Sequence, residues 1–181
     1  MSLNQLIEHL EELADDMTRK AASGEITVKQ WRLGMKQIIR DGHNAASELG
    51  LAGEQLNIFQ RAGEWLRRQH TIRQQMGYLR GFENQIRNGL LDSESLLGAV
   101  RARARMYGNA ARTTFDKIRQ QIAKLRGRKE KRRVLSGNAK HCNTCLEQAR
   151  LGWVPIDDPR VTAVGENTEC MSADRCSIDY R

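Results

Sequence analysis

The chain has 181 residues, of which 39% are hydrophobic, 29% are charged and 5% are aromatic. This length is enough for one domain with a small appendage, and the scarcity of aromatic residues disfavours a large compact core. We therefore expect an elongated helical assembly that partner chains complete. The apolar runs are too short to span a bilayer, and the acidic, amphipathic first residues differ from a secretory signal. These features predict an intracellular protein with no membrane partner.

The net charge of +8 is unevenly distributed along the chain. Residues 101–133 carry 13 basic and 2 acidic side chains, whereas residues 1–60 and 134–181 are net acidic. This basic tract predicts non-specific contact with DNA phosphates or with an acidic partner, and the alternative is a solvated helix face. The candidate contact residues are Arg126, Arg128, Lys129, Lys131, Arg132 and Arg133.

Residues 1–52 predict a helical hairpin. The first helix is expected over about residues 2–22, with Leu3, Leu6, Leu10, Leu13 and Met17 as its apolar seam. The motif TVKQ, from Thr27 to Gln30, is a capping box that starts a second helix, which ends near Leu49. Its seam is Val28, Trp31, Met35, Ile38, Ala45 and Leu49. We expect Leu10, Trp31, Met35 and Ile38 to form a packing seam that also joins copies into a homo-oligomer.

Residues 53–133 predict long helices with a basic C-terminal end. A third helix is expected over about residues 54–87, with a kink near Gly77 or Gly81. Gly89 is expected to end it, and Asp92 or Ser93 to cap a fourth helix that reaches about Arg126. Phe59, Phe82, Tyr107 and Phe115 are expected in the core or in a subunit interface. Residues 126–134 are interpreted as a basic hinge.

All four cysteines lie in the last segment, residues 134–181. Cys142 and Cys145 are separated by two residues, and Cys170 and Cys176 by five. Two such pairs can complete a tetrahedral, structural zinc site, with His141 as a possible substitute ligand. Disulfides or buried thiols are the alternatives. The fold class that follows is mainly α, with elongated helical hairpins or a bundle and a small cysteine-rich, zinc-knuckle-like α+β module.

Nothing in the sequence predicts an enzyme. Four thiolate ligands would leave zinc no open position for substrate. The chain has no phosphate-binding glycine loop, no nucleophile elbow and no paired-carboxylate motif.

The tail resembles the C-terminal end of bacteriophage minor head proteins of the head-morphogenesis family. The matching elements, in order, are His141-Cys142 to Cys145, Gly152-Trp153, the loop from Pro155 to Pro159, Cys170, and Arg175-Cys176 to Tyr180. The stretches LRRQHTIRQQMGYLRGFENQIRNG and RARARMYGNAARTTF are similar to the helical part of such proteins, so that the resemblance covers about residues 60–181.

The resemblance implies a structural virion protein, made in the host cytoplasm and placed in the head or at the head–tail junction. It would act at the portal vertex, as a minor head or head–tail connector component, in head assembly and in DNA packaging or retention. Its partners would be the portal or other head and tail proteins, and packaged DNA. The alternative is a zinc-containing DNA-binding regulator or packaging accessory protein.

Overall fold

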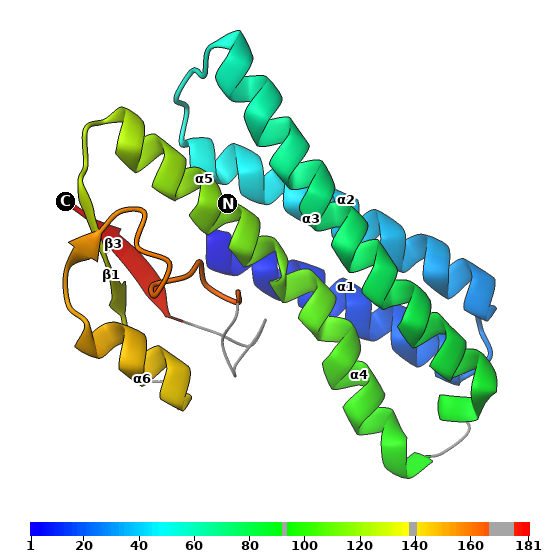
Figure 1. The fold of residues 1–181 in the computed structure, drawn as a ribbon. Helices are drawn as coiled ribbons and strands as arrows, with labels where there is room; N and C mark the ends of the chain where they lie inside the picture. The colour runs from blue at the N-terminus through cyan, green and yellow to red at the C-terminus, as the bar shows by residue number, and fades with distance from the viewer. Residues whose placement is uncertain (92–93, 138–140, 167–175) are drawn as a thin grey trace.

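A computed structural model describes residues 1–91, 94–137, 141–166 and 176–181, and Figure 1 shows a helical body with a small C-terminal α+β module. The body contains α1 (Leu3–Ala22), α2 (Val28–Leu51), α3 (Ile58–Gln85), a π-helical turn (Ile86–Leu90), α4 (Glu94–Asn109) and α5 (Ala111–Leu125). The module contains β1 (Glu130–Val134), α6 (Asn143–Arg150), β2 (Val154–Pro155) and β3 (Ser177–Tyr180). The predicted fold class is confirmed. Across the described residues, no helix is both long and apolar enough to cross a membrane.

Capping boxes start the first three helices. The predicted box at Thr27 is confirmed, since its side chain accepts from the Gln30 backbone while the Gln30 side chain accepts from the Thr27 N–H. Ser2 and Asn57 cap α1 and α3 in the same way. Each box satisfies backbone donors that the first helical turn leaves without partners. Local sequence therefore fixes where these helices begin.

Two predictions about the long helices are wrong. The third helix has no break at Gly77 or Gly81, and the chain leaves helical geometry only at Asn88 and Gly89, where Gly89 has φ 89°. An isolated glycine costs a helix only about 1 kcal/mol, which packing can offset. The predicted fourth helix is two helices that meet at Ala110. The predicted caps Asp92 and Ser93 lie outside the described residues.

Helices of the same chain bury the residues of the expected packing seam. Leu10, Trp31, Met35 and Ile38 are 3%, 0%, 0% and 7% exposed. The expectation that a second copy covers this seam is therefore wrong, because α4 packs on α1 and α5 packs on α2. Leu13, expected in the seam, is 40% exposed, since the buried face of α1 runs through Ile7 and Ala14 instead.

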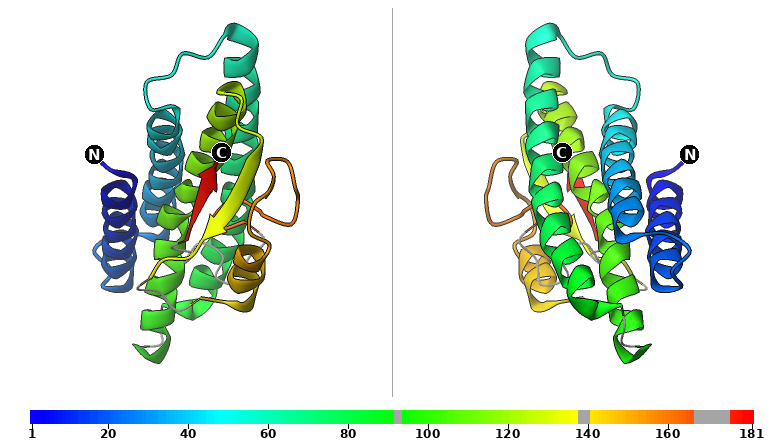
Figure 2. Two further views of the ribbon diagram at one scale, coloured as in Figure 1. Left: turned by 90° about the vertical axis from the view of Figure 1, so that its left-hand side faces the viewer. Right: turned by 90° about the vertical axis from the view of Figure 1, so that its right-hand side faces the viewer.

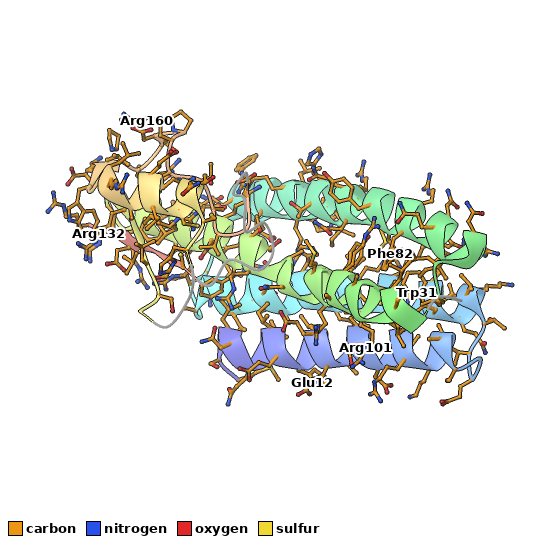
Figure 3. The ribbon with its side chains drawn as sticks, turned by 90° about the horizontal axis from the view of Figure 1, so that it is seen from below. Glu12, Trp31, Phe82, Arg101, Arg132 and Arg160 are labelled. Atoms are coloured by element: carbon orange, nitrogen blue, oxygen red, sulfur yellow. The ribbon has the colours of Figure 1, made fainter. Side chains whose placement is uncertain are left out.

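Aromatic contacts occupy the centre of this core. The Trp31 and Phe82 rings meet edge to face with centroids 5.4 Å apart, and Phe82 stacks on Tyr107 at 6.1 Å. Figure 3 shows Trp31 and Phe82 between the helices. The Trp31 Nε1–H donates to Thr18 Oγ1 at 3.1 Å, so the buried indole has a partner. Three aromatic residues are enough to fill the centre of the core because they contact one another there.

The C-terminal module is a three-stranded antiparallel sheet in the order β2-β1-β3, with α6 packed beside β1. Residues 126–134, interpreted above as a hinge, are instead a turn at Gly127 followed by the central strand of this sheet. The expected boundary between residues 133 and 134 consequently falls inside β1. Figure 2 shows the module on the side of α5 that faces away from α1.

Candidate functional site

A stripe of polar side chains on α5 holds the C-terminal module. The stripe consists of Thr113, Asp116, Lys117, Gln120 and Lys124. Thr113 donates to the Val164 carbonyl at 2.8 Å, and the Asp116 carboxylate accepts from the Val164 N–H at 3.0 Å. Lys117 pairs with Glu166 at 2.7 Å. Because these positions recur every three or four residues, they share one helix face. Two lysines of the basic tract therefore bind the chain's own module.

Much of the rest of the basic tract also contacts acidic groups of the same chain. Arg101 on α4 donates two hydrogen bonds to Asp15 on α1, at 2.9 and 2.7 Å, and lowers the pKa of that carboxyl group. Arg126 pairs with Glu54 in the loop before α3. The tract is therefore not one continuous exposed surface, because the acidic N-terminal and C-terminal segments fold against it.

Lys131 and Arg133 were predicted to contact an external partner, and this prediction is wrong. They are 5% and 3% exposed, since alternate residues of β1 point to the same, covered face of the sheet. Burial lowers the pKa of Lys131. The Arg133 Nε–H donates to Gln148 on α6 at 3.1 Å. Both residues consequently belong to the interior of the module.

A cleft of about 280 Å³ lies between the C-terminal end of α5 and β3. Arg119, Arg126 and Arg128 line the cleft, together with Trp153 and Tyr180. Within the part of the chain that the structure describes, the side chains of Arg119 and Arg128 have no hydrogen-bond or ion-pair partner. The cleft therefore offers guanidinium groups that are available to a polyanion.

Arg119 is absent from the residues that the sequence selects for contact. Arg119 and Arg126 are seven residues apart, which is about two helical turns and places them on one face. The seven-residue spacing is the feature of the sequence from which Arg119 and Arg126 could have been recognised as one contact pair. The adjacent Lys129 is exposed, and its side chain, too, has no ion-pair partner among the described residues.

Trp153 is fixed at the edge of the cleft by two cations. The guanidinium carbons of Arg132 and Arg181 lie 4.7 and 4.5 Å from the centre of its ring. Arg132 also pairs with Asp179 on β3 at 3.0 Å (Figure 3 labels Arg132 at the module end). These contacts tie β1 and β3 to the loop after α6. Trp153 is thus a packing anchor, and Arg132 is only partly available to an external partner.

The structure brings together several of the predicted zinc ligands in pairs. Cys142 caps α6, and its sulfur accepts from the Cys145 N–H at 3.4 Å. The Cys176 sulfur lies 3.5 Å from Nδ1 of His141, whose Nε2 lies 2.8 Å from the Ser136 carbonyl oxygen. Cys170 lies outside the described residues.

Thiol and imidazole groups are the ligands that zinc prefers, so the donor chemistry fits that metal. The geometry is less complete: in the described ranges, no three His, Cys, Asp or Glu side chains converge closely enough to hold a metal ion. A zinc site here is accordingly a proposal that depends on Cys170 as well.

A larger cavity, of about 580 Å³, lies between α3 and the α4–α5 junction. Its two cations are already engaged, because Arg103 stacks on Phe82 at 4.3 Å and Lys117 pairs with Glu166. Burial raises the pKa of Tyr107, on its wall, to about 12. The smaller cleft is therefore the better candidate for binding an anion.

The fold and these sites define a helical protein with a C-terminal cysteine-containing α+β module and a basic cleft where the two meet. Comparison with protein-family models, with curated proteins and with solved structures found no match for this chain.

Proposed function

We propose that this chain is a structural protein of a bacteriophage particle, a minor head or head–tail connector component at the portal vertex, which contacts packaged DNA. The resemblance of the tail motifs supports the place in the particle. The single structural observation that supports DNA contact is the cleft lined by Arg119, Arg126 and Arg128. Guanidinium groups bind phosphate oxygens through paired hydrogen bonds.

DNA contact in this cleft is independent of base sequence. Phosphate contacts position a protein on the duplex without specifying sequence. The three arginines of the cleft lie between the C-terminal end of α5 and β3, and phosphate contact by these groups requires no element in the major groove. We infer a role in holding or guiding DNA.

The C-terminal module, in this proposal, is a structural zinc module. Its ligands are Cys142, Cys145, Cys170 and Cys176, with His141 as a possible substitute for one sulfur. Zinc would supply a cross-link between α6 and the chain before β3, in a segment too small for a core of its own. The residues of the cleft, not the metal, contact DNA.

Two measurements test the proposed function. The chain should be found in purified phage particles by quantitative mass spectrometry, in a fixed number of copies per portal. Absence from particles, combined with tight binding to one short duplex sequence, would support the regulator instead and overturn the virion role.

DNA contact is tested by changing Arg119, Arg128 and Lys129 to Gln together. A matched control changes Lys29, Lys36 and Arg40 of α2 to Gln, which removes the same charge at a distance from the cleft. The cleft variant should bind duplex DNA more weakly, and the slope of log affinity against log salt should fall by about 2–3. Equal effects of the two triple variants would show that only net charge matters.

A further inference from the structure

Arg126, just after α5, belongs both to the basic cleft and to an ion pair with Glu54. It lines the cleft together with Arg119 and Arg128. Its guanidinium group also donates two hydrogen bonds to Oε1 of Glu54, one from Nε at 3.1 Å and one from Nη2. Arg119 and Arg128 make no such pair with the rest of the described chain. A carboxylate of the same chain therefore already occupies one of the three cleft arginines.

The backbone is fixed on both sides of this ion pair. The Arg126 N–H donates to the Ile122 carbonyl at 3.0 Å and so closes the end of α5. The Glu54 N–H donates to the Leu51 carbonyl at 2.9 Å, and the next apolar residue of the loop, Leu56, is buried against α5. Figure 1 shows this loop and the end of α5 at the same end of the helical body. The two side chains, of Arg126 and Glu54, are 52% and 41% exposed, so they can separate without a movement of the backbone.

A phosphate oxygen of DNA fits Arg126 in the same way as the carboxylate oxygen of Glu54. Both are anionic acceptors of hydrogen bonds from a guanidinium group. An exposed ion pair contributes little free energy, because water and salt screen it. Once Arg119 and Arg128 hold one part of a DNA strand, neighbouring phosphates of that strand reach a high local concentration at Arg126. A polyanion can therefore displace Glu54, whereas a single small anion lacks this advantage.

We propose that Glu54 is an internal competitor of DNA, which holds Arg126 in the free protein and releases it when the cleft binds DNA phosphates. This inference rests on the DNA contact proposed above and concerns the regulation of that same cleft. Binding begins at Arg119 and Arg128 and is completed by Arg126. Because the carboxylate must first be displaced, Glu54 lowers the affinity of the cleft for DNA.

Glu54→Gln tests the competition, since it removes the negative charge and keeps the size of the side chain. This variant should bind a short DNA duplex about two- to fivefold more tightly, the range expected for loss of an exposed ion pair. The slope of log affinity against log salt should steepen by up to about 0.9, because Arg126 then carries a counterion that DNA releases.

Glu48→Gln is the matched control for the change in net charge. Glu48 is exposed near the end of α2, and no hydrogen bond or ion pair joins its side chain to the described residues. The control should therefore raise DNA affinity less than Glu54→Gln does. Equal effects of the two variants on the wild-type chain would contradict the competition, because net charge alone would then explain both.

A double-mutant cycle tests whether Glu54 acts through Arg126. In a chain that already carries Arg126→Gln, the further change Glu54→Gln should have no larger effect than Glu48→Gln. An effect of Glu54→Gln that is equally strong without Arg126 overturns the competition.

Failure of the DNA contact itself is recognised with Arg119→Gln and Arg128→Gln in one chain. If this variant binds DNA as tightly as the wild-type chain, the cleft is not the contact site, and the competition is overturned with it. If the variant loses affinity but Glu54 and Arg126 show no coupling, the DNA contact stands and only the competition is overturned.

Discussion

Nδ1 of His43 on α2 lies 2.7 Å from Oγ1 of Thr114 on α5, in a position with no solvent exposure. Burial, with smaller contributions from the nearby charges of Arg68 and Lys117, lowers the pKa of His43 to about 4. The imidazole is therefore neutral when the protein is folded at neutral pH. Its hydrogen bond joins the two helices that carry the cleft and the core.

Stability should consequently fall as the pH drops from about 6.5 to about 4. In this window the unfolded chain binds a proton at His43 that the folded chain excludes, so the free energy of unfolding decreases, by up to about 3 kcal/mol. Urea unfolding at several pH values measures this loss. His43→Gln keeps a hydrogen-bonding group and does not titrate, so it should show a flatter dependence. An equal slope in both proteins would contradict the assignment to His43.

Gly108→Ala should destabilise the helical body by about 1–3 kcal/mol. A Cβ at this position would lie 2.8 Å from the backbone carbon of Leu10 and 2.9 Å from the nitrogen of Glu11, so α4 would have to move away from α1. Gly98→Ala in the same helix is the control, because a Cβ there meets nothing within 4 Å. It should be neutral or stabilising, through helix propensity. Thermal unfolding compares the two, and similar midpoints would show that α1 and α4 are not in tight contact.

The proposed zinc module predicts about one zinc per chain when the protein is purified without chelator. Cys142→Ser should lower the zinc content and increase hydrogen exchange in α6 and β3 while leaving α1 to α5 protected. His141→Ala separates the two ligand sets: zinc is retained if four cysteines bind it and is reduced if His141 replaces one. Zinc below a tenth of an equivalent, with disulfides detected by mass, would exclude the site.

Substitutions of Arg101 and of Arg119 should change different properties of the protein, although both residues belong to the basic tract. Arg101→Gln removes the pair with Asp15 and should lower the melting temperature without changing DNA affinity. Arg119→Gln, in the cleft, should weaken DNA binding and leave the melting temperature unchanged. Melting curves and DNA titrations of the two single variants test this. If Arg101→Gln weakens DNA binding as much as Arg119→Gln, the cleft is not the contact site.

The sequence alone determined the local features of this protein. Thr27 and Gln30 specify a helix start by their own side chains, and Trp31, Met35 and Ile38 mark a buried face by their spacing. The change from helical periodicity to turn and β-branched residues indicated a separate C-terminal module. These signals are readable because each depends on residues within a few positions of one another.

Only the tertiary structure decided which charges and apolar groups remain available. A run of arginines attracts an acidic surface, but nothing local tells whether that surface belongs to another molecule or to the same chain, as Asp15 does for Arg101. Likewise, Leu10 and Phe59 are both apolar helix residues. Leu10 is buried because α4 returns to cover it, whereas Phe59 is 85% exposed, with no helix or strand of the described residues covering it. Burial and pairing are long-range properties, because they depend on which distant segments the fold brings together.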